Sequence, residues 1–326
     1  MKIKVSELRQ FAEKALEKYG YSDPEITTIA DILMYAQLRG NNQGIVKLIG
    51  KGIPKREGGE SPKIVKETPV SALFDGNKTH AMIVMDLATD TAIKKAKESG
   101  VGIVGNFGSS ESTGALGYYA KKIADAGLIG IAYASAPFQT TAPHGSTEAR
   151  FCTNPMAYGI PTEGEPIVLD MSTSAIAYYG LIEAKTAGKT LPEGIGYDKD
   201  GKSTQDPAEI MSGAIKAFGG HKGSGLALIV QIFAGALVQA DSFDNDSDNA
   251  GNLVIAIDPE ILTSKESFTK EVSSIIQRIK SARKAEGVNE ITIPGERANA
   301  FNTKVMNSGE IEVEDNLLAE LKKVTE

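Results

Sequence analysis

The 326-residue sequence predicts an α/β protein, and three observations support this. Short apolar runs typical of strands alternate with amphipathic stretches typical of helices through most of the chain. The first forty residues contain two helical patterns and no strand pattern. The composition, 41% hydrophobic and 24% charged, is that of a globular protein, and the length suits about two domain-sized units.

Each element is predicted from the spacing of its apolar residues and from the residues that can cap it. Ser6 is the expected N-cap of the first helix, and Ser22 or Asp23 that of the second, where Pro24 suits the first turn. Residues 50–76 are expected to form a loop with short strands around Ile64–Val65 and Ala72–Phe74. Further helices are expected at about Asp86–Glu98, Thr113–Ala126, Ser174–Ala187, Pro207–Lys216, His221–Gln239, Ser267–Lys284 and Asp315–Lys323, and strands at Val101–Val104, Ile129–Ala134, Ile167–Met171 and Leu253–Ile257.

Charge and composition argue against several classes of protein. The net charge of −7 disfavours a general nucleic-acid binder, and the basic stretch between Arg278 and Lys284 is interpreted as a solvated helix face. Cys152 is the single cysteine, which rules out an internal disulfide and a cysteine zinc site. The N-terminal residues do not resemble a signal peptide, and no apolar run is expected to approach the roughly 18 residues of a membrane span. A cytoplasmic protein without a membrane partner is therefore expected.

The most informative motif runs from Gly219 to Gly225 and leads directly into an apolar helix. Its small residues let a ligand approach the backbone closely, and the helix that follows directs unpaired N–H groups toward that ligand. Lys222 and His221 add positive charge at the same place. The motif therefore predicts an anion site, against the alternative of a glycine-rich helix start with an exposed lysine.

Four other motifs are less informative, and none of them supports a function. The glycines of Val101–Gly108 do not have the spacing of a Rossmann fingerprint. The acidic run Asp244–Asp248 lacks the glycine position and final glutamate of an EF-hand, so an acidic surface loop is the favoured interpretation. His80, His144 and His221 do not have metalloprotease spacing, and no serine-hydrolase elbow is present.

Several blocks, in the right order, resemble the malate/L-lactate dehydrogenase family, whose relatives include ureidoglycolate, sulfolactate and diketogulonate enzymes and cyclic-ketimine reductases. They extend from about residue 5 to beyond residue 300, and the Asp-Met-x-Thr-Ser and Gly-His-Lys-Gly blocks are the most specific. The blocks are Ala30–Leu33 with Leu38–Gly40, Gly114–Tyr119, Gly127–Ala132, Thr153–Pro155, Asp170–Ser174, Pro192–Gly194 with Thr204–Pro207, Gly220–Gly223, Ile255–Glu260 and Pro294–Glu296.

The resemblance implies an α/β fold that is not a Rossmann fold, with a central cofactor-binding sheet domain and a helical lobe formed by both chain ends. The expected division is 1–75 packed with the tail 295–326, and a cofactor- and substrate-binding domain at 76–294. A homodimer that uses NAD or NADP is implied. The expected cofactor residues are His221, Lys222, Gly223, Ser172, Thr173 and Asn154.

The chain departs from the family pattern on the substrate side. After Leu-Arg-Gly the family has a Ser-His pair and, further on, an arginine that binds the substrate carboxylate. This chain is one residue shorter there, so Asn42 and Gln43 replace the pair and Lys47 replaces the arginine. Lysine keeps the charge but lacks the bidentate fork of arginine. Lys47 and Asn42 are therefore expected substrate-binding residues.

The second departure concerns the family's general acid/base. Its Asn-x-Asn-His-Phe-Gly block aligns with residues 109–114, which places Ser112 at the position of the histidine and Glu111 beside it. A serine hydroxyl does not shuttle a proton near pH 7 unaided. The candidate catalytic residues are Ser112, Gln43 and Glu111. Proton donors left open are Glu111, Tyr118, Tyr119, His144 and a water held by Gln43 and Ser112, and Tyr118 and His144 are also candidate substrate contacts.

Two functions follow. The first is an oxidoreductase that transfers a hydride between nicotinamide and a small 2-oxo or 2-hydroxy acid, or a cyclic imine acid. A protonated imine already carries its proton, so hydride addition to it needs no strong acid. The second is a nicotinamide-binding sensor or partner protein without turnover, which accounts for the absent histidine directly. Lys47 favours the enzyme, because a non-catalytic protein has no use for a carboxylate site.

Overall fold

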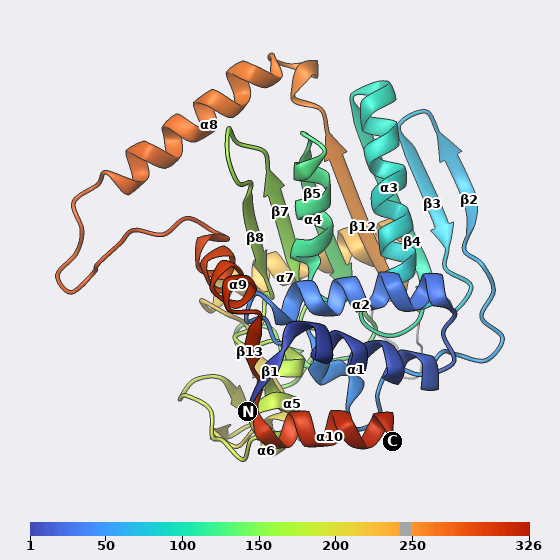
Figure 1. Cartoon of the computed structure of the whole chain (residues 1–326), viewed down its shortest axis with the longest axis vertical. Coiled ribbons are helices and arrows are strands. Elements are labelled where there is room, and N and C mark those ends of the chain that lie inside the picture. Colours follow the sequence, from blue (N-terminus) through green and yellow to red (C-terminus); the bar gives the residue numbers. More distant parts are fainter. Residues whose placement is uncertain (242–248) are drawn as a thin grey trace.

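The computed structural model describes residues 1–241 and 249–326, and its centre is a seven-stranded mixed sheet (Figure 1). The strand order is β2-β3-β4-β12-β5-β7-β8, and neighbouring strands are antiparallel except β3 and β4. The α/β class is confirmed, and a pattern dominated by antiparallel pairs is unlike a Rossmann sheet. The strands are β2 (Lys63–Thr68), β3 (Ser71–Asp75), β4 (Val101–Ser109), β5 (Ile129–Ser135), β7 (Met156–Ile160), β8 (Ile167–Met171) and β12 (Ala250–Ile257).

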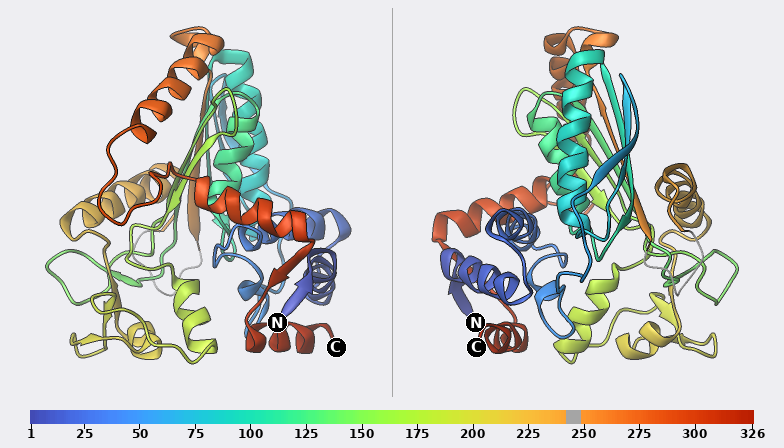
Figure 2. Two further views of the ribbon diagram at one scale, coloured as in Figure 1. Left: turned by 60° about the vertical axis from the view of Figure 1, so that its left-hand side comes forward. Right: turned by 90° about the vertical axis from the view of Figure 1, so that its right-hand side faces the viewer.

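Helices cover both faces of this sheet. Helices α3 (Ala81–Ser99) and α4 (Leu116–Asp125) lie on one face, and α7 (His221–Ala234) lies on the other (Figure 2). The backbones of α3 and α4 approach the strands closely. A Cβ at Gly102 of β4 would lie 2.1 Å from the Ala92 carbonyl oxygen, and one at Gly159 of β7 would lie 2.0 Å from that of Ala120. Glycine at these positions lets each helix pack directly on the sheet.

Both chain ends form a helical lobe beside the sheet. Strand β1 (Lys2–Lys4) pairs antiparallel with β13 (Glu310–Glu312). Around this pair lie α1 (Val5–Lys18), α2 (Asp23–Gln37), α9 (Glu296–Ser308) and α10 (Asp315–Thr325) (Figure 1). The ends of the chain thus pack together, but β3, which precedes residue 76, belongs to the central sheet by its pairing with β4. The expected division at residue 75 stays a prediction.

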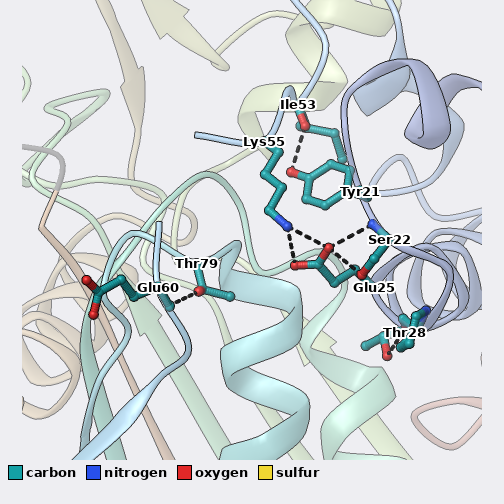
Figure 3. A network of polar contacts seen from close by, with 9 residues as sticks. Tyr21, Ser22, Glu25, Thr28, Ile53, Lys55, Glu60 and Thr79 are labelled. Atoms are coloured by element: carbon teal, nitrogen blue, oxygen red, sulfur yellow. Dashed lines mark hydrogen bonds and ion pairs between the residues drawn. The ribbon is translucent and has the colours of Figure 1, made fainter. Parts of the chain in front are cut away.

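Helix α2 has Ser22 as its N-cap, one of the two residues that the sequence predicts, and its start is fixed by a capping box with Glu25. The backbone N–H and hydroxyl of Ser22 both donate to Glu25 Oε2, at 2.8 and 2.7 Å. Lys55 donates to both carboxylate oxygens of Glu25, at 2.9 and 2.8 Å, and the Tyr21 hydroxyl donates to the Ile53 carbonyl (Figure 3). These contacts tie the loop after residue 48 to α2.

A smaller four-stranded sheet of order β10-β9-β11-β6 lies at one end of the large one. Helices α5 and α6 pack beside it around a second core of Leu181, Leu191, Ile210 and Ile215. Its elements are β6 (Thr141–Ala142), α5 (Tyr178–Thr186), β9 (Gly196–Tyr197), β10 (Ser203–Thr204), α6 (Pro207–Ser212) and β11 (Ala214–Lys216).

Several sequence predictions were wrong in detail. The first helix begins at Val5 with Lys4 as its N-cap, so Ser6 lies inside the helix. Helix α3 begins at Ala81 instead of Asp86, because the His80 side chain accepts the Met82 N–H and caps it. The helix predicted at Pro207–Lys216 ends at Ser212, and its last residues form β11. Strands β1, β6, β7, β9, β10 and β13 and helix α9 were not predicted.

Helix α7 has two apolar faces, and its outer face is exposed. Residues 221–238, which add the short 3₁₀ helix η2 (Ala236–Val238), are apolar and long enough to cross a membrane by length and composition, which the sequence analysis did not expect. Gly223, Ala227, Val230, Gln231 and Ala234 of this helix are buried. The opposite side exposes Leu228, Ile229, Ile232 and Phe233.

Helix α8 (Lys265–Lys280) follows the 3₁₀ helix η3 (Pro259–Ile261) and projects away from the sheet (Figure 1). It has no buried residue, which agrees with the solvated face predicted for its basic residues. Lys280 forms ion pairs with Glu290 and Glu296, at 2.9 and 2.6 Å. The predicted acidic loop Asp244–Asp248 lies outside the described residues.

We expect Gly159→Ala to lower the free energy of unfolding by about 1–3 kcal/mol or more, because the new methyl group must displace the Ala120 carbonyl of α4. Gly225→Ala is the matched control, since a Cβ at that exposed helical position meets no atom within 4 Å. It should raise the free energy of unfolding by up to about 1 kcal/mol. Urea unfolding followed by circular dichroism measures both, and equal effects of the two variants would contradict the packing argument.

Candidate active site

The glycine-rich motif forms the start of helix α7, as its sequence predicts. Gly220 is the N-cap, and Gly219 and Gly220 have φ angles of 56° and 63°, which favour glycine. His221 and Lys222 occupy the first turn and are exposed. His144 lies beside them, its ring centroid 6.0 Å from that of His221, and the backbone N–H of His144 donates to the Ser224 hydroxyl. The positive end of the helix dipole and Lys222 therefore meet at one place.

Two loops are fastened to α7 by buried polar contacts. Asn154 has no exposed surface, and its Nδ2 donates to the Ala227 carbonyl at 2.9 Å and to Gln231 Oε1 at 2.8 Å. The Thr173 hydroxyl lies 3.1 Å from the carbonyl oxygens of Thr153 and Asn154 and donates to them. Asn154 and Thr173 thus hold the loops in place beside the helix.

Glycine is also required at position 223, where a Cβ would lie 2.0 Å from the Phe218 carbonyl oxygen. The helix therefore turns tightly against the segment that precedes it. The neighbouring Ser172 hydroxyl donates to the Ser174 carbonyl at 3.0 Å. All six predicted cofactor residues thus lie on α7 or on the two loops beside it, although they are up to 69 positions apart in the sequence.

A cavity of about 290 Å³ opens beside this helix start, lined by His144, Lys216 and Tyr197 and by Gly219 and Gly220. Lys216 donates to the Ser203 hydroxyl at 3.0 Å and lies 4.4 Å above the Tyr197 ring. Sequence reasoning did not single out Lys216 or Tyr197. The cations, N–H donors and open glycine backbone together suit an extended ligand that carries phosphate groups.

A second polar cluster centres on Lys47, which is 1% exposed. Lys47 lies in the 3₁₀ helix η1 (Ile45–Leu48), whose first N–H is accepted by Gln37 Oε1 at 3.2 Å. Its Nζ donates to the Ser112 hydroxyl at 2.8 Å and lies 3.2 Å from the centroid of the Tyr179 ring. Lys47 and Ser112, which were both predicted as site residues, are therefore in direct contact.

The electrostatics of this cluster are set by burial. Desolvation lowers the pKa of Lys47 well below its ordinary value, and the charge of Glu111 partly opposes that shift. His80 is 3% exposed, and burial, followed by the nearby Lys47 charge, lowers its pKa to about 3. Its Nδ1 accepts the Met82 N–H, so the imidazole is neutral with its proton on Nε2, which has no partner in the described part of the chain.

The other predicted substrate-side residues divide into two groups. Asn42 and Gln43 lie near the Lys47 cluster: Gln43 Nε2 donates to Asn42 Oδ1 at 3.2 Å, and a Cβ at Gly180 of α5 would lie 2.6 Å from Asn42 Nδ2. Glu111 has a φ of 62° and acts electrostatically on Lys47. His144 lies instead at the start of α7.

Two predicted proton donors lie in the aromatic core. Tyr118 packs edge-on against Tyr35 and Tyr119. Tyr119 has no exposed surface, and its hydroxyl donates to the Thr113 carbonyl at 2.7 Å. The structure thus does not place either tyrosine in contact with Lys47 or Ser112.

The two clusters are joined through a short segment of chain. The Thr173 carbonyl accepts the Phe218 N–H at 3.0 Å, shortly before α7, and Tyr179, six residues after Thr173, contacts Lys47. Sequence reasoning missed Tyr179 and His80, because neither lies at a diagnostic spacing from Lys47. The segment from Thr173 to Tyr179 therefore contacts both Phe218, just before α7, and the buried lysine cluster.

Asp170 of β8 is a half-buried residue whose carboxyl group contacts the start of α4. Its Oδ2 accepts the Gly117 N–H at 2.9 Å. Burial raises the pKa of Asp170 to about 6, and the hydrogen bond from Gly117 opposes part of this shift.

Comparisons with known proteins agree with this arrangement. Residues 3–322 match the sequence model of a family described as malate/L-lactate dehydrogenase. L-sulfolactate dehydrogenase of Methanocaldococcus jannaschii is 34% identical over 95% of this chain and 92% of its own length. Delta(1)-pyrroline-2-carboxylate/Delta(1)-piperideine-2-carboxylate reductase of Pseudomonas syringae pv. tomato is 31% identical over 88% of this chain and 86% of its own. The crystal structure of a dehydrogenase from Sinorhizobium meliloti superposes with a TM-score of 0.88 and 27% identity, covering 100% of this chain and 98% of that one.

We expect Asp170→Asn to remove part of the pH dependence of stability. A raised carboxyl pKa means that the folded protein binds the proton more tightly than the unfolded chain. This contribution to the stability of the folded protein is fully present below about pH 4 and is lost as the pH rises through about 6. The variant should therefore gain stability relative to the natural chain as the pH rises from 4 to 7, by up to about 3 kcal/mol.

Urea unfolding across this pH range measures the difference between the two proteins. The asparagine side chain of the variant retains an oxygen that can accept the Gly117 N–H. Asp200→Asn, at an exposed position, is the control for the chemical change from aspartate to asparagine. A pH-independent difference for Asp170→Asn would show that this carboxyl group does not titrate as described.

Proposed function

The chain belongs to the malate/L-lactate dehydrogenase family, a family of oxidoreductases, and on that premise we propose its reaction: hydride transfer between NAD or NADP and a small 2-oxo or 2-hydroxy acid, or a cyclic imine acid. The observation that carries the proposal is the joining of the anion-binding start of α7 to the buried Lys47 cluster by the segment from Thr173 to Tyr179. The cytoplasm is the proposed location.

The proposed cofactor site is the start of α7. Lys222 and His221 would lie against the phosphate or ribose groups, supported by the helix N-terminus and the open backbone at Gly219. Asn154 and Thr173 hold the neighbouring loops, and Gly223 permits the tight turn. Ser172 would lie near the cofactor. The nicotinamide, when bound, supplies or accepts the hydride, and the protein holds and orients the reactants.

The proposed substrate site lies on the Lys47 side. Asn42, Gln43, Glu111 and Ser112 are half-buried around the fully buried lysine, so their polar groups are accessible to a small ligand. Tyr118 and His144 remain predicted substrate contacts. Two chemistries are proposed for this site, because one relative is named a sulfolactate dehydrogenase and another an imine-carboxylate reductase.

We expect the purified protein to oxidise NADH or NADPH in the presence of at least one 2-oxo acid or cyclic imine acid. Steady-state loss of reduced-cofactor absorbance against a panel of both classes measures this. Turnover of an oxo acid alone would remove the imine proposal. Tight cofactor binding without turnover by any compound would favour a non-catalytic nicotinamide-binding protein, and absence of binding would contradict the proposed function.

Cofactor binding is tested separately with Lys222→Met. The loss of one exposed cation at a helix N-terminus should weaken reduced-cofactor binding about fivefold to tenfold, which corresponds to about 1 kcal/mol. The effect should diminish as salt is added. Lys2→Met, on the exposed strand β1, is the control and should bind like the natural chain when followed by cofactor fluorescence.

We further propose that the protein is a homodimer in which a second copy covers the outer face of α7. Leu228, Ile229 and Ile232 of this face are between 46% and 49% exposed. Contiguous exposed apolar residues of this kind are typical of an interaction surface. The family resemblance implies the same state.

The double variant Leu228→Glu/Ile232→Glu should be monomeric or bind its partner at least about a hundredfold more weakly, because two charges would enter an apolar interface. Size-exclusion chromatography with light scattering measures the mass. Ile64→Glu, on the exposed edge strand β2, is the control and should leave the mass unchanged. A natural chain that is monomeric at micromolar concentration would contradict the proposal.

A further inference from the structure

We propose that Ser112 and Lys47 form one proton-transfer pair. The Ser112 hydroxyl donates a proton to the substrate oxygen, and the Lys47 ammonium group donates a proton to the serine oxygen in its place. The proposal rests on the proposed oxidoreductase function and names the group that performs its acid–base step. It gives Lys47 a different role from the one that the resemblance implies, which is to hold the substrate carboxylate.

The first argument concerns the direction of the serine proton. Ser112 Oγ accepts two hydrogen bonds, from Lys47 Nζ at 2.8 Å and from the Gly114 N–H at 3.2 Å. A hydroxyl oxygen has two acceptor positions, so both are in use, and its own O–H must point elsewhere. Within the described residues the structure gives this O–H no acceptor. Because Ser112 is half-buried, its proton is available to a ligand oxygen on the open side.

The second argument concerns the surroundings of Lys47. Its amine is enclosed, with the face of Tyr179 on one side and Ser112 as its hydrogen-bond acceptor. The titratable groups beside it are Glu111, which favours its charged form, and His80, which burial keeps neutral. Because burial lowers the pKa of Lys47, its ammonium releases a proton more readily than an exposed lysine does. Ser112 receives that proton.

Atoms and electrons balance in this step. When hydride adds to the substrate carbonyl carbon, the π-electron pair of the C=O bond moves to the oxygen, which takes the proton of the Ser112 hydroxyl. The serine oxygen takes a proton from Lys47 Nζ, which becomes a neutral amine, and water later returns a proton to it. In the direction of alcohol oxidation each transfer is reversed. Ser112 is thus the catalytic residue and Lys47 acts through it.

Variants at both positions test the pair with a 2-oxo acid as substrate. Ser112→Ala and Lys47→Met should each lower kcat about 10²- to 10³-fold with little change in KM, because they remove the proton donor and not the binding site. Ser112→Thr, which keeps the hydroxyl, should remain within about tenfold of the natural chain. The pH dependence of kcat attributed to Lys47 should vanish in Lys47→Met.

Lys47→Arg separates this role from carboxylate binding. Arginine keeps the charge but does not give up its proton in a protein, so kcat should stay about as low as in Lys47→Met. If Lys47 only holds the substrate carboxylate, arginine should restore both kcat and KM, and that result would overturn the proposal. Cofactor binding by fluorescence and circular dichroism spectra establish that each variant is folded.

A second measurement does not depend on turnover. In protein labelled with ¹³Cε,¹⁵Nζ-lysine, the Lys47 signal is identified by its loss in Lys47→Arg. We expect its titration midpoint by NMR to lie below those of the exposed lysines and to move in Ser112→Ala. A Lys47 titration midpoint equal to those of the exposed lysines would overturn the proposed proton-transfer pair. Failure of the natural chain to turn over any substrate would contradict the proposed function, whereas the NMR titration would still decide the pairing.

Discussion

The direct contact of helix backbones with the central sheet determines where the polar groups of the site lie. Gly102 and Gly159 allow α3 and α4 to lie on the strands without side chains between them. The loop between β4 and α4 carries Ser112, and the cap of α3 carries His80, which bridges to Ser110 of that loop. The position of the serine relative to the buried lysine therefore depends on how closely two helices approach one sheet.

The sequence contained enough local information to predict the outline of this fold and part of its site. The N-cap of α2 and the alternation of apolar strands with helices are short-range patterns, and these predictions were confirmed. The glycine-rich start of α7 was found for the same reason. Strand β7 was missed because it is short and contains Gly159, whose role becomes evident only when α4 is packed on it. The end of α6 was misplaced because Ala214–Lys216 gain their extended conformation from pairing with β6 and β9.

The buried lysine cluster was predicted only in part, since its contacts are long-range. Alignment with the family placed Lys47 and Ser112 at substrate-side positions, but their hydrogen bond joins residues 65 positions apart. Tyr179 and His80 leave no periodic or motif signal, because one contributes a ring face and the other a buried cap. Lys47 and Ser112, the two positions at which the resemblance predicts a departure from the family pattern, are in contact in the structure. The two predicted departures therefore concern one hydrogen-bonded pair of side chains, and the proposed proton transfer between them accounts for both.

The contact between Lys47 and Tyr179 also gives the site an optical property. The lysine nitrogen lies 3.2 Å from the centre of the phenol ring, so a change in its charge alters the electric field across that ring. Such a field shifts the near-ultraviolet absorption of tyrosine. The chain has ten tyrosines and no tryptophan, whose stronger absorption would mask the shift. Tyr179 is thus a built-in chromophore for the protonation state of the amine beside it.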